Sequence, residues 1–276
     1  MAVKSPLVNV MERAARKAGR GLVRDFGEVE QLQVSPKGPG DFVSTADTKA
    51  EAVLKEELSR ARPAFGFLME ESGETAGSDD EHRWIVDPLD GTVNFLHGVP
   101  RFCISIAVER RWTAAGRPRS EIISGLVYDP ITDDSYWADK SQGAYLNDRR
   151  MRVSGRRSMA EAMLAIGFPT LGRGDHRTYL ARVAALMDQT GGLRRFGSAA
   201  LDLAYVAAGR FEGYWQDGLE PWDMAAGILL VREAGGFVSD LSGGGEMIAS
   251  GSLVAANDHL HEQLRRIVAG AVPAPA

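Results

Sequence analysis

A series of short apolar segments between residues 65 and 147 constrains the fold of this chain more than any other feature. The segments are FGFLM, RWIVD, FCISIAVER, EIISGLVYD, DSYWAD and AYLN. Turn formers such as DPITDD and LNDRR separate several of them, which is typical of β-hairpins. We therefore expect a sheet built largely from antiparallel hairpins rather than from uninterrupted βαβ units.

Helical patterns flank these segments on both sides. Ser5 and Pro6 form a helix-start signal, and apolar residues then recur at helical spacing as far as Val29, which predicts one long amphipathic helix. A loop rich in proline and glycine, residues 35–41, is expected to separate it from a second helix around residues 50–58. Three further helices are predicted in the second half, beginning at Asp175, Ser198 and Asp223.

The whole chain is expected to form one domain of mixed α/β (α+β) class, residues 1–276. It has 276 residues with 44% hydrophobic content, which is enough to bury a substantial core. We find no internal repeat, low-complexity tract or break in composition that would mark a second independent domain.

Charge and composition exclude several function classes. A net charge of -5 argues against a general nucleic-acid binder, and the arginine cluster between residues 149 and 157 is interpreted as a local solvated patch. The N-terminus has no signal-peptide core, and no apolar run is long enough to span a bilayer, so we expect a cytoplasmic protein without a membrane association. Cys103 lies in an apolar run and is expected to be a core thiol.

Residues 84–94, WIVDPLDGTVN, place two carboxylates at the end of a buried strand. Pro88 fixes the backbone between Asp87 and Asp90, so the turn can aim both side chains at one point. Two carboxylates that close repel each other, and a cation resolves the repulsion. Oxygen ligands favour a hard ion such as Mg²⁺. The alternative is an ordinary solvated turn, in which Asp is common.

Two other acidic stretches strengthen the metal interpretation. An apolar strand runs directly into Glu70 and Glu71, and Asp223 follows Pro221-Trp222 at the start of an Ala/Gly-rich helix. Each has a simpler explanation: the two glutamates could be solvated, and Asp223 could be only the N-cap of its helix. Three acidic stretches that converge would instead form a binding site for cations.

The stretches MEES (69–72), DPLDGTVNF (87–95) and PWDMAAG (221–227) resemble, in order and spacing, the signature motifs of the inositol monophosphatase family. These enzymes are Mg²⁺-dependent, lithium-sensitive phosphomonoesterases. The resemblance implies a layered α-β-α-β-α sandwich of the inositol monophosphatase/fructose-bisphosphatase type and a homodimer. It also implies a metal-site half, approximately residues 1–150, and a substrate or cap half, approximately residues 151–276.

The resemblance also implies the roles of individual residues. One Mg²⁺ would be held by Glu70, Asp87 and the backbone carbonyl of Leu89. A second Mg²⁺ would be held by Asp87, Asp90 and Asp223, so that Asp87 bridges the two. Thr92 would help Glu70 to orient and deprotonate the attacking water, which makes Glu70, Thr92 and Asp87 the expected catalytic residues.

The substrate-binding residues are expected at three places. Backbone N–H groups of Gly91 and Thr92 would receive phosphate oxygens, as tight glycine-containing turns often do. The helix start at Ser198 and Ala199 would contact the ligand. Gln216 stands where the resemblance implies a glutamate that contacts substrate hydroxyls, with Asp217 as a possible substitute for the missing charge, and Asp223 closes the set.

The expected function is hydrolysis of a small phosphate monoester, most readily inositol 1-phosphate, by an inositol-phosphate phosphatase. Histidinol phosphate, other sugar or polyol phosphates and adenosine bisphosphate remain alternative substrates. An alternative from a different class is a regulatory role in binding RNA or a transcription complex, since some bacterial relatives are thought to act there. The arginine cluster, Arg149, Arg150, Arg152, Arg156 and Arg157, would be its docking site.

Overall fold

The computed structural model describes residues 3–28, 34–38, 41–169 and 174–271. Its larger sheet has eight strands in the order β10-β9-β8-β7-β6-β5-β3-β4. The strands are β3 (Gly66–Met69), β4 (Gly73–Thr75), β5 (His82–Asp90), β6 (Cys103–Ala114), β7 (Arg117–Asp129), β8 (Asp134–Asp139), β9 (Gly143–Leu146) and β10 (Arg149–Arg150).

The expected antiparallel hairpins account for most of this sheet. Strands β5 to β10 pair antiparallel with their sequence neighbours. The exception is β3, which pairs parallel with β5, because the intervening residues return along the far edge as β4. The ends of β3 and β5 therefore lie side by side, which brings two of the acidic stretches together.

The smaller sheet has five strands in the order β12-β11-β13-β15-β14. The strands are β11 (Met163–Ile166), β12 (Gly192–Arg194), β13 (Gly213–Asp217), β14 (Phe237–Ser239) and β15 (Ser252–Ala256). Strand β11 pairs parallel with both of its neighbours, whereas β15 pairs antiparallel with β13 and β14. This mixed sheet carries Gln216 on its central strand.

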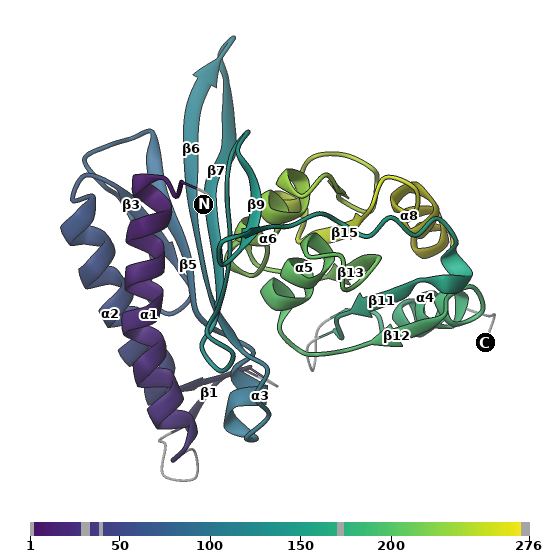
Figure 1. Ribbon diagram of the computed structural model, residues 1–276, viewed down its shortest axis with the longest axis horizontal. Coiled ribbons are helices and arrows are strands. Elements are labelled where there is room, and N and C mark those ends of the chain that lie inside the picture. The colour runs from purple at the N-terminus through teal and green to yellow at the C-terminus, as the bar shows by residue number, and fades with distance from the viewer. Residues whose placement is uncertain (1–2, 29–33, 39–40, 170–173, 272–276) are drawn as a thin grey trace.

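Two long helices, α1 (Pro6–Phe26) and α2 (Thr45–Ala61), cover the outer face of the larger sheet (Figure 1). The start of α1 is as predicted, with the Ser5 hydroxyl accepting a hydrogen bond from the Val8 N–H at 3.2 Å. Val29 lies outside the described residues. The expected loop over residues 35–41 is partly wrong, because β1 (Val34–Gly38) and β2 (Asp41–Ser44) pair as a small hairpin.

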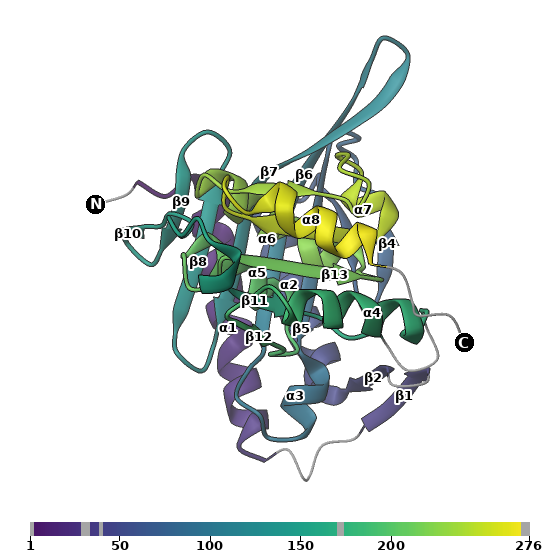
Figure 2. The same cartoon turned by 90° about the vertical axis from the view of Figure 1, so that its right-hand side faces the viewer.

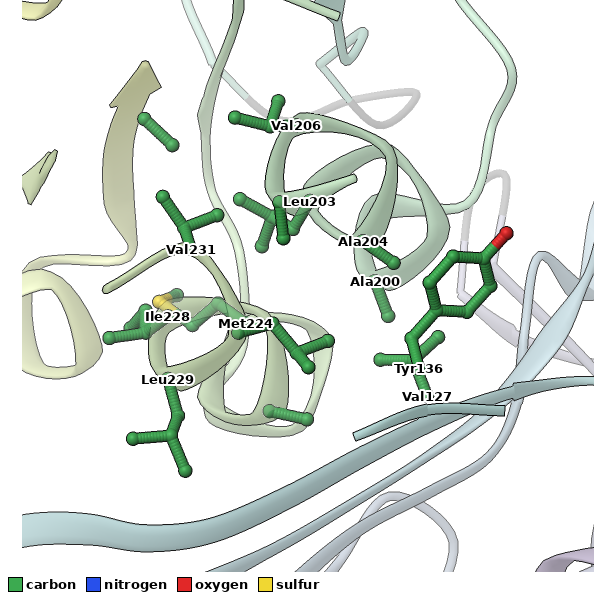
Figure 3. Close-up of a cluster of buried hydrophobic side chains, with 14 of the residues drawn as sticks. Val127, Tyr136, Ala200, Leu203, Ala204, Val206, Met224, Ile228, Leu229 and Val231 are labelled. Carbon is green, nitrogen blue, oxygen red and sulfur yellow. The ribbon is translucent and has the colours of Figure 1, made fainter. Parts of the chain in front are cut away.

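Helices α5 (Ala199–Ala207) and α6 (Pro221–Glu233) form the layer between the two sheets. Figure 3 shows Leu203 of α5 near Ile228 and Val231 of α6, with Val127 of the larger sheet below them. These side chains are buried in one continuous apolar cluster. Gly227 permits this close approach, since a Cβ there would lie 2.4 Å from a methyl carbon of Leu203.

Helices α4 (His176–Met187) and α8 (His261–Gly270) cover the outer face of the smaller sheet (Figure 2). The short elements α3 (Thr92–Leu96), η2 (Met159–Glu161) and α7 (Met247–Ser250) complete the described fold. The order of layers is helix, sheet, helix, sheet, helix, which confirms the expected mixed α/β sandwich. The boundary near residue 150 between a metal-site half and a cap half stays a prediction.

None of the helices in the described part of the chain combines the length and the apolar character needed to cross a bilayer.

Candidate metal and phosphate site

A β-bulge at the end of β5 positions the first two acids. Asp87 pairs with Ser105 of β6, and Asp90 pairs with Cys103, so two residues of β5 stand opposite one of β6. One of them is Pro88, which tolerates this position because a bulge requires no ladder hydrogen bond from it. The other, Leu89, has a fully buried side chain, and its N–H donates to Asp87 Oδ1 at 2.9 Å. The bulge thus fixes both carboxylates and the carbonyl between them.

Glu70 reaches the same place from the neighbouring parallel strand. Its N–H donates to the Val86 carbonyl at 3.2 Å, which continues the parallel register of Met69 with Val86 and places Glu70 beside Asp87. The next residue, Glu71, donates its N–H to Glu51 Oε2 of α2 at 2.9 Å. Helix α2 therefore supports the turn that presents Glu70.

Asp223 comes from the N-terminus of α6, but it is not the N-cap. The helix begins at Pro221 with Glu220 as its cap, and Asp223 is the third helical residue. Its Oδ2 accepts a hydrogen bond from the Glu220 N–H at 2.8 Å. Proline at the first helical position moves the start of the helix two residues earlier than the sequence prediction placed it.

Asp90 is anchored by the first turn of α5. Its Oδ2 accepts hydrogen bonds from the Ser198 hydroxyl at 2.6 Å and from the Ala200 N–H at 2.7 Å. The Cys103 thiol also lies 3.7 Å from this oxygen, and burial is the largest cause that raises the pKa of the thiol. Cys103 is therefore the buried core thiol that the sequence predicts, and a thiolate nucleophile is disfavoured there.

The four acids act on one another electrostatically. Burial raises the pKa of Asp87 well above its usual range, and Glu70, Asp90 and Asp223 add to the rise. Burial followed by the charge of Asp90 raises the pKa of Asp223 in the same way. The pKa of Asp90 is also raised by burial, although its hydrogen bonds from α5 oppose the change. The four acids predicted from the sequence therefore lie close enough to act on one another electrostatically.

By donor chemistry this set fits a hard divalent cation. It offers carboxylate oxygens and one carbonyl, which are the ligands that Mg²⁺ prefers, and it concentrates negative charge around Asp87. Within the residues that the structure describes, no three acidic, histidine or cysteine side chains converge closely enough to hold an ion as they stand. Asp90 and Asp223 each direct one oxygen to a backbone N–H instead. The second oxygen of a carboxylate can still bind a cation while the first is held in this way.

Thr92 is hydrogen-bonded to a residue that the sequence prediction omitted. Its hydroxyl lies 3.0 Å from Asp47 Oδ1 and 3.0 Å from the Leu89 carbonyl, and its one proton serves one acceptor at a time. Asp47 is fully buried at the start of α2, where its Oδ2 accepts from the Ser44 N–H at 2.9 Å. Ser44 and Asp47 form the capping box of α2, and the fold places the same Asp opposite Thr92.

Gly91 makes the turn between Asp90 and α3 possible. Its φ is +100°, and a Cβ at this position would lie 2.9 Å from the Arg101 carbonyl. The two conditions together favour glycine, because it adopts a positive φ without strain and has no Cβ to clash with a nearby backbone. The turn therefore presents Thr92 directly after the two aspartates.

The predicted substrate residues of the second half gather around a cavity of about 110 Å³ beside the acids. Its walls include two predicted metal ligands, Asp90 and Asp223, and three predicted substrate-binding residues, Ser198, Ala199 and Gln216. Glu70, Asp87, Gly91 and Thr92 are not part of these walls. Asp217 also lies elsewhere, because its carboxylate is paired with Arg182 at 2.5 Å and lines a neighbouring cavity.

With this geometry established, known proteins provide an independent comparison. The model of the inositol monophosphatase family matches residues 3–272. The chain therefore belongs to the inositol monophosphatase family, a family of phosphoric monoester hydrolases.

Individual relatives agree over nearly the full length. An inositol-1-monophosphatase of Mesorhizobium japonicum is 54% identical over 265 residues, which cover 96% of this chain and 97% of the relative. The Nus factor SuhB of Escherichia coli is 44% identical over 252 residues, covering 91% of each chain. A crystal structure of the extragenic suppressor protein suhB from Bartonella henselae superposes with a TM-score of 0.89 at 54% identity, covering 96% of this chain and 98% of that one.

Proposed function

We propose that this chain is a Mg²⁺-dependent phosphatase that hydrolyses a small phosphate monoester, with inositol 1-phosphate as its preferred substrate. The observation that carries the proposal is the group of acids around Asp87, to which Glu70, Asp90 and Asp223 each contribute charge. The similarity to an inositol-1-monophosphatase at 54% identity supports the choice of substrate.

Two ions would share this site. Glu70, Asp87 and the Leu89 carbonyl would hold one, and Asp87, Asp90 and Asp223 would hold the other. When bound, such a pair of ions supplies a lowered pKa for the attacking water and neutralises charge on the phosphate. The bulge in β5 suits this role, because it sets Asp87, the Leu89 carbonyl and Asp90 on one short, rigid turn.

The chain itself would position the water and the phosphate. When the Thr92 hydroxyl donates its proton to Asp47 Oδ1, the lone pairs of Thr92 Oγ1 can accept a hydrogen from water. Glu70 would receive the proton that this water loses. The N–H groups of Gly91 and Thr92 would bind phosphate oxygens at the start of α3.

The alcohol portion of the substrate would occupy the cavity of about 110 Å³ beside Asp90 and Asp223. Ser198, Ala199 and Gln216 belong to its walls. A cavity of this size is smaller than pockets for drug-sized ligands, which measure about 300–1,000 Å³. It suits a polyol better than a nucleoside, and this preference favours inositol phosphate over adenosine bisphosphate.

Phosphate release from a small panel of substrates tests the proposal. We expect Mg²⁺-dependent release from inositol 1-phosphate, slower release from histidinol phosphate and the slowest release from adenosine bisphosphate, with all three abolished by EDTA. Phosphate release that persists in EDTA would contradict the metal assignment. A preference for histidinol phosphate would support the phosphatase assignment but contradict inositol 1-phosphate as the preferred substrate.

Three accompanying proposals follow from the same family membership. The protein would act in the cytoplasm, would form a homodimer and would be inhibited by lithium. Sedimentation and a lithium titration of phosphate release test the last two directly.

A second candidate function is favoured by the relative named Nus factor SuhB, which is 44% identical to this chain. The candidate docking site is the arginine cluster, whose members are all exposed: Arg149, Arg150, Arg152, Arg156 and Arg157. Arg156 is already paired with the buried Glu212 at 2.8 Å, so four arginines remain to be reversed. Replacing those four by Glu should abolish capture of transcription components, and unchanged capture would exclude this surface.

A further inference from the structure

Asp202 is a buried carboxylate to which neither the sequence motifs nor the roles proposed above assign a function. It lies in the first turn of α5, four residues after Ser198, and only 2% of its surface is exposed. Its Oδ1 has no hydrogen-bond partner among the described residues. Buried carboxylates are almost always hydrogen-bonded, because leaving one unpaired is strongly unfavourable.

Asp202 is one of the residues that line the candidate substrate cavity. Asp90 and Gln216 line the same cavity. Asp90 and Asp202 differ, however, in their hydrogen bonds: Asp90 Oδ2 accepts from Ser198 and Ala200, whereas Asp202 Oδ1 has no partner among the described residues. Asp202 therefore offers the cavity an acceptor that still requires a donor.

Arg195 does not satisfy this requirement. Its charge acts on Asp202 from a distance, but the two residues form no ion pair within the described structure. The guanidinium instead lies over the Phe168 ring, 5.2 Å from its centroid, where Phe168 is 51% exposed. Arg195 thus belongs to the outer rim of the cavity.

Gln216 offers the complementary group. Its Oε1 accepts a hydrogen bond from the Tyr214 hydroxyl at 2.5 Å. The side chain lies flat against Gly167, where an added Cβ would fall 1.6 Å from Oε1. With one lone pair of Oε1 occupied by Tyr214, the amide N–H groups of Gln216 supply donors for a ligand.

A donor from Gln216 and an acceptor from Asp202 suit one chemical group, a hydroxyl, which accepts the first hydrogen bond and donates the second. We infer that Asp202 determines substrate specificity by accepting a hydrogen bond from a hydroxyl in the alcohol portion of a polyol monophosphate. This inference rests on the proposed phosphatase function.

Asp217 is the rival residue, since it directly follows Gln216 in the sequence. It is already paired with Arg182 and lines the neighbouring cavity. Asp202→Asn and Asp217→Asn make the same chemical change, so comparing them shows which of the two carboxylates affects substrate preference.

The experiment measures kcat and KM of both variants with two substrates. Inositol 1-phosphate has hydroxyls in its alcohol portion, and phenyl phosphate has none. For Asp202→Asn we expect KM for inositol 1-phosphate to rise roughly tenfold, as when a buried polar partner of a substrate hydroxyl is weakened, with little change for phenyl phosphate. For Asp217→Asn, the ratio of kcat/KM between the two substrates should equal that of the wild type. Thermal unfolding of both variants checks that each is folded, and Asp202→Ala provides a second substitution.

The possible results are distinct. An equal loss of kcat/KM with both substrates in Asp202→Asn would show that Asp202 is structural and would overturn the inference. A change in the preference between the two substrates seen only for Asp217→Asn would also overturn it. If the wild type releases phosphate from neither substrate, the proposed function fails. Calorimetric binding of myo-inositol with Mg²⁺ and inorganic phosphate then still decides the role of Asp202: weaker binding by Asp202→Asn supports the inference, and equal binding or no binding by the wild type overturns it.

Discussion

Ser198 and Asp90 are joined by a hydrogen bond of 2.6 Å between α5 and the end of β5, although 108 residues separate them in sequence. The same Asp90 oxygen accepts the Ala200 N–H. The bond therefore connects the middle helical layer with the larger sheet and holds a candidate metal ligand in a fixed orientation.

Ser198→Ala should weaken Mg²⁺ binding. The variant removes one of the hydrogen bonds that orient Asp90, and the loss of such a supporting partner typically reduces metal affinity about 10–100-fold. Cys103→Ala is the matched control, because its thiol contacts the same oxygen at the longer distance of 3.7 Å, and we expect an effect several times smaller. Calorimetric titration with Mg²⁺ measures both. Equal affinities of wild type and Ser198→Ala would contradict a positioning role for Ser198.

Thr92 and Asp47 should act as one unit in catalysis. Thr92→Val keeps the shape of the side chain but removes the hydroxyl, and we expect kcat to fall by about 10²-fold or more, as for loss of a proton-transfer group. Asp47→Asn should have a comparable effect, and Thr92→Ser should recover most of the activity.

The double variant distinguishes coupling from independent damage. If the two residues form one hydrogen-bonded unit, Thr92→Val combined with Asp47→Asn should be little slower than either single variant. Losses that multiply would show that the hydrogen bond has no catalytic role. Steady-state rates at saturating Mg²⁺ provide the comparison.

Without metal, Asp87→Asn should unfold at a higher temperature than the wild type. The substitution removes a buried negative charge that lies among other acids, and removing such repulsion should stabilise the fold by about 1 kcal/mol or more. For a chain of this length that corresponds to a rise in Tm of about 2–4 °C. Calorimetry in EDTA measures the change, and a lower Tm would indicate that Asp87 stabilises the metal-free fold.

The stability advantage of Asp87→Asn should also depend on pH. The pKa of Asp87 is raised in the folded protein, first by burial and then by its acidic neighbours. The folded state then binds more protons than the unfolded state, so the contribution of Asp87 is fully present below its unfolded pKa of about 3.9 and is lost as pH rises through the folded value.

The difference in Tm between variant and wild type should therefore widen in EDTA as pH rises above the unfolded pKa of about 3.9. Partial burial lowers the pKa of His261, and its opposite contribution is common to both proteins, so it cancels. Saturating Mg²⁺ should reverse the order of the two proteins. A difference in Tm that does not change with pH would contradict the raised pKa.

Sequence patterns predict local structure and candidate ligands well here. Local sequence determines the hairpin strands, the start of α1 at Ser5 and the cap of α4 at Asp175. These elements can therefore be predicted without knowledge of the tertiary structure. The candidate metal ligands can also be predicted from local sequence, since each lies at the end of a strand or at the start of a helix. Their convergence, however, depends on the parallel pairing of β3 with β5, which the run of hairpins did not predict.

The residues that the sequence did not single out are defined by distant partners. Asp47 resembles an ordinary capping residue until Thr92, 45 positions later, is placed beside it. Asp202 resembles a polar residue in an apolar helix, whereas Asp217 directly follows Gln216 and is the expected substitute for the missing charge. Only the tertiary structure shows that Asp217 is paired with Arg182, whereas Asp202 lines the cavity.

The most direct test of the central claim is phosphate release from inositol 1-phosphate by wild type and Asp87→Asn, measured side by side across a Mg²⁺ titration. We predict activity in the wild type that depends on Mg²⁺ and vanishes in EDTA. We predict a loss of at least about 10²-fold in Asp87→Asn at every Mg²⁺ concentration, because this residue would bridge both ions. Full turnover by Asp87→Asn with Mg²⁺ would contradict the assignment of this cluster as the catalytic metal site.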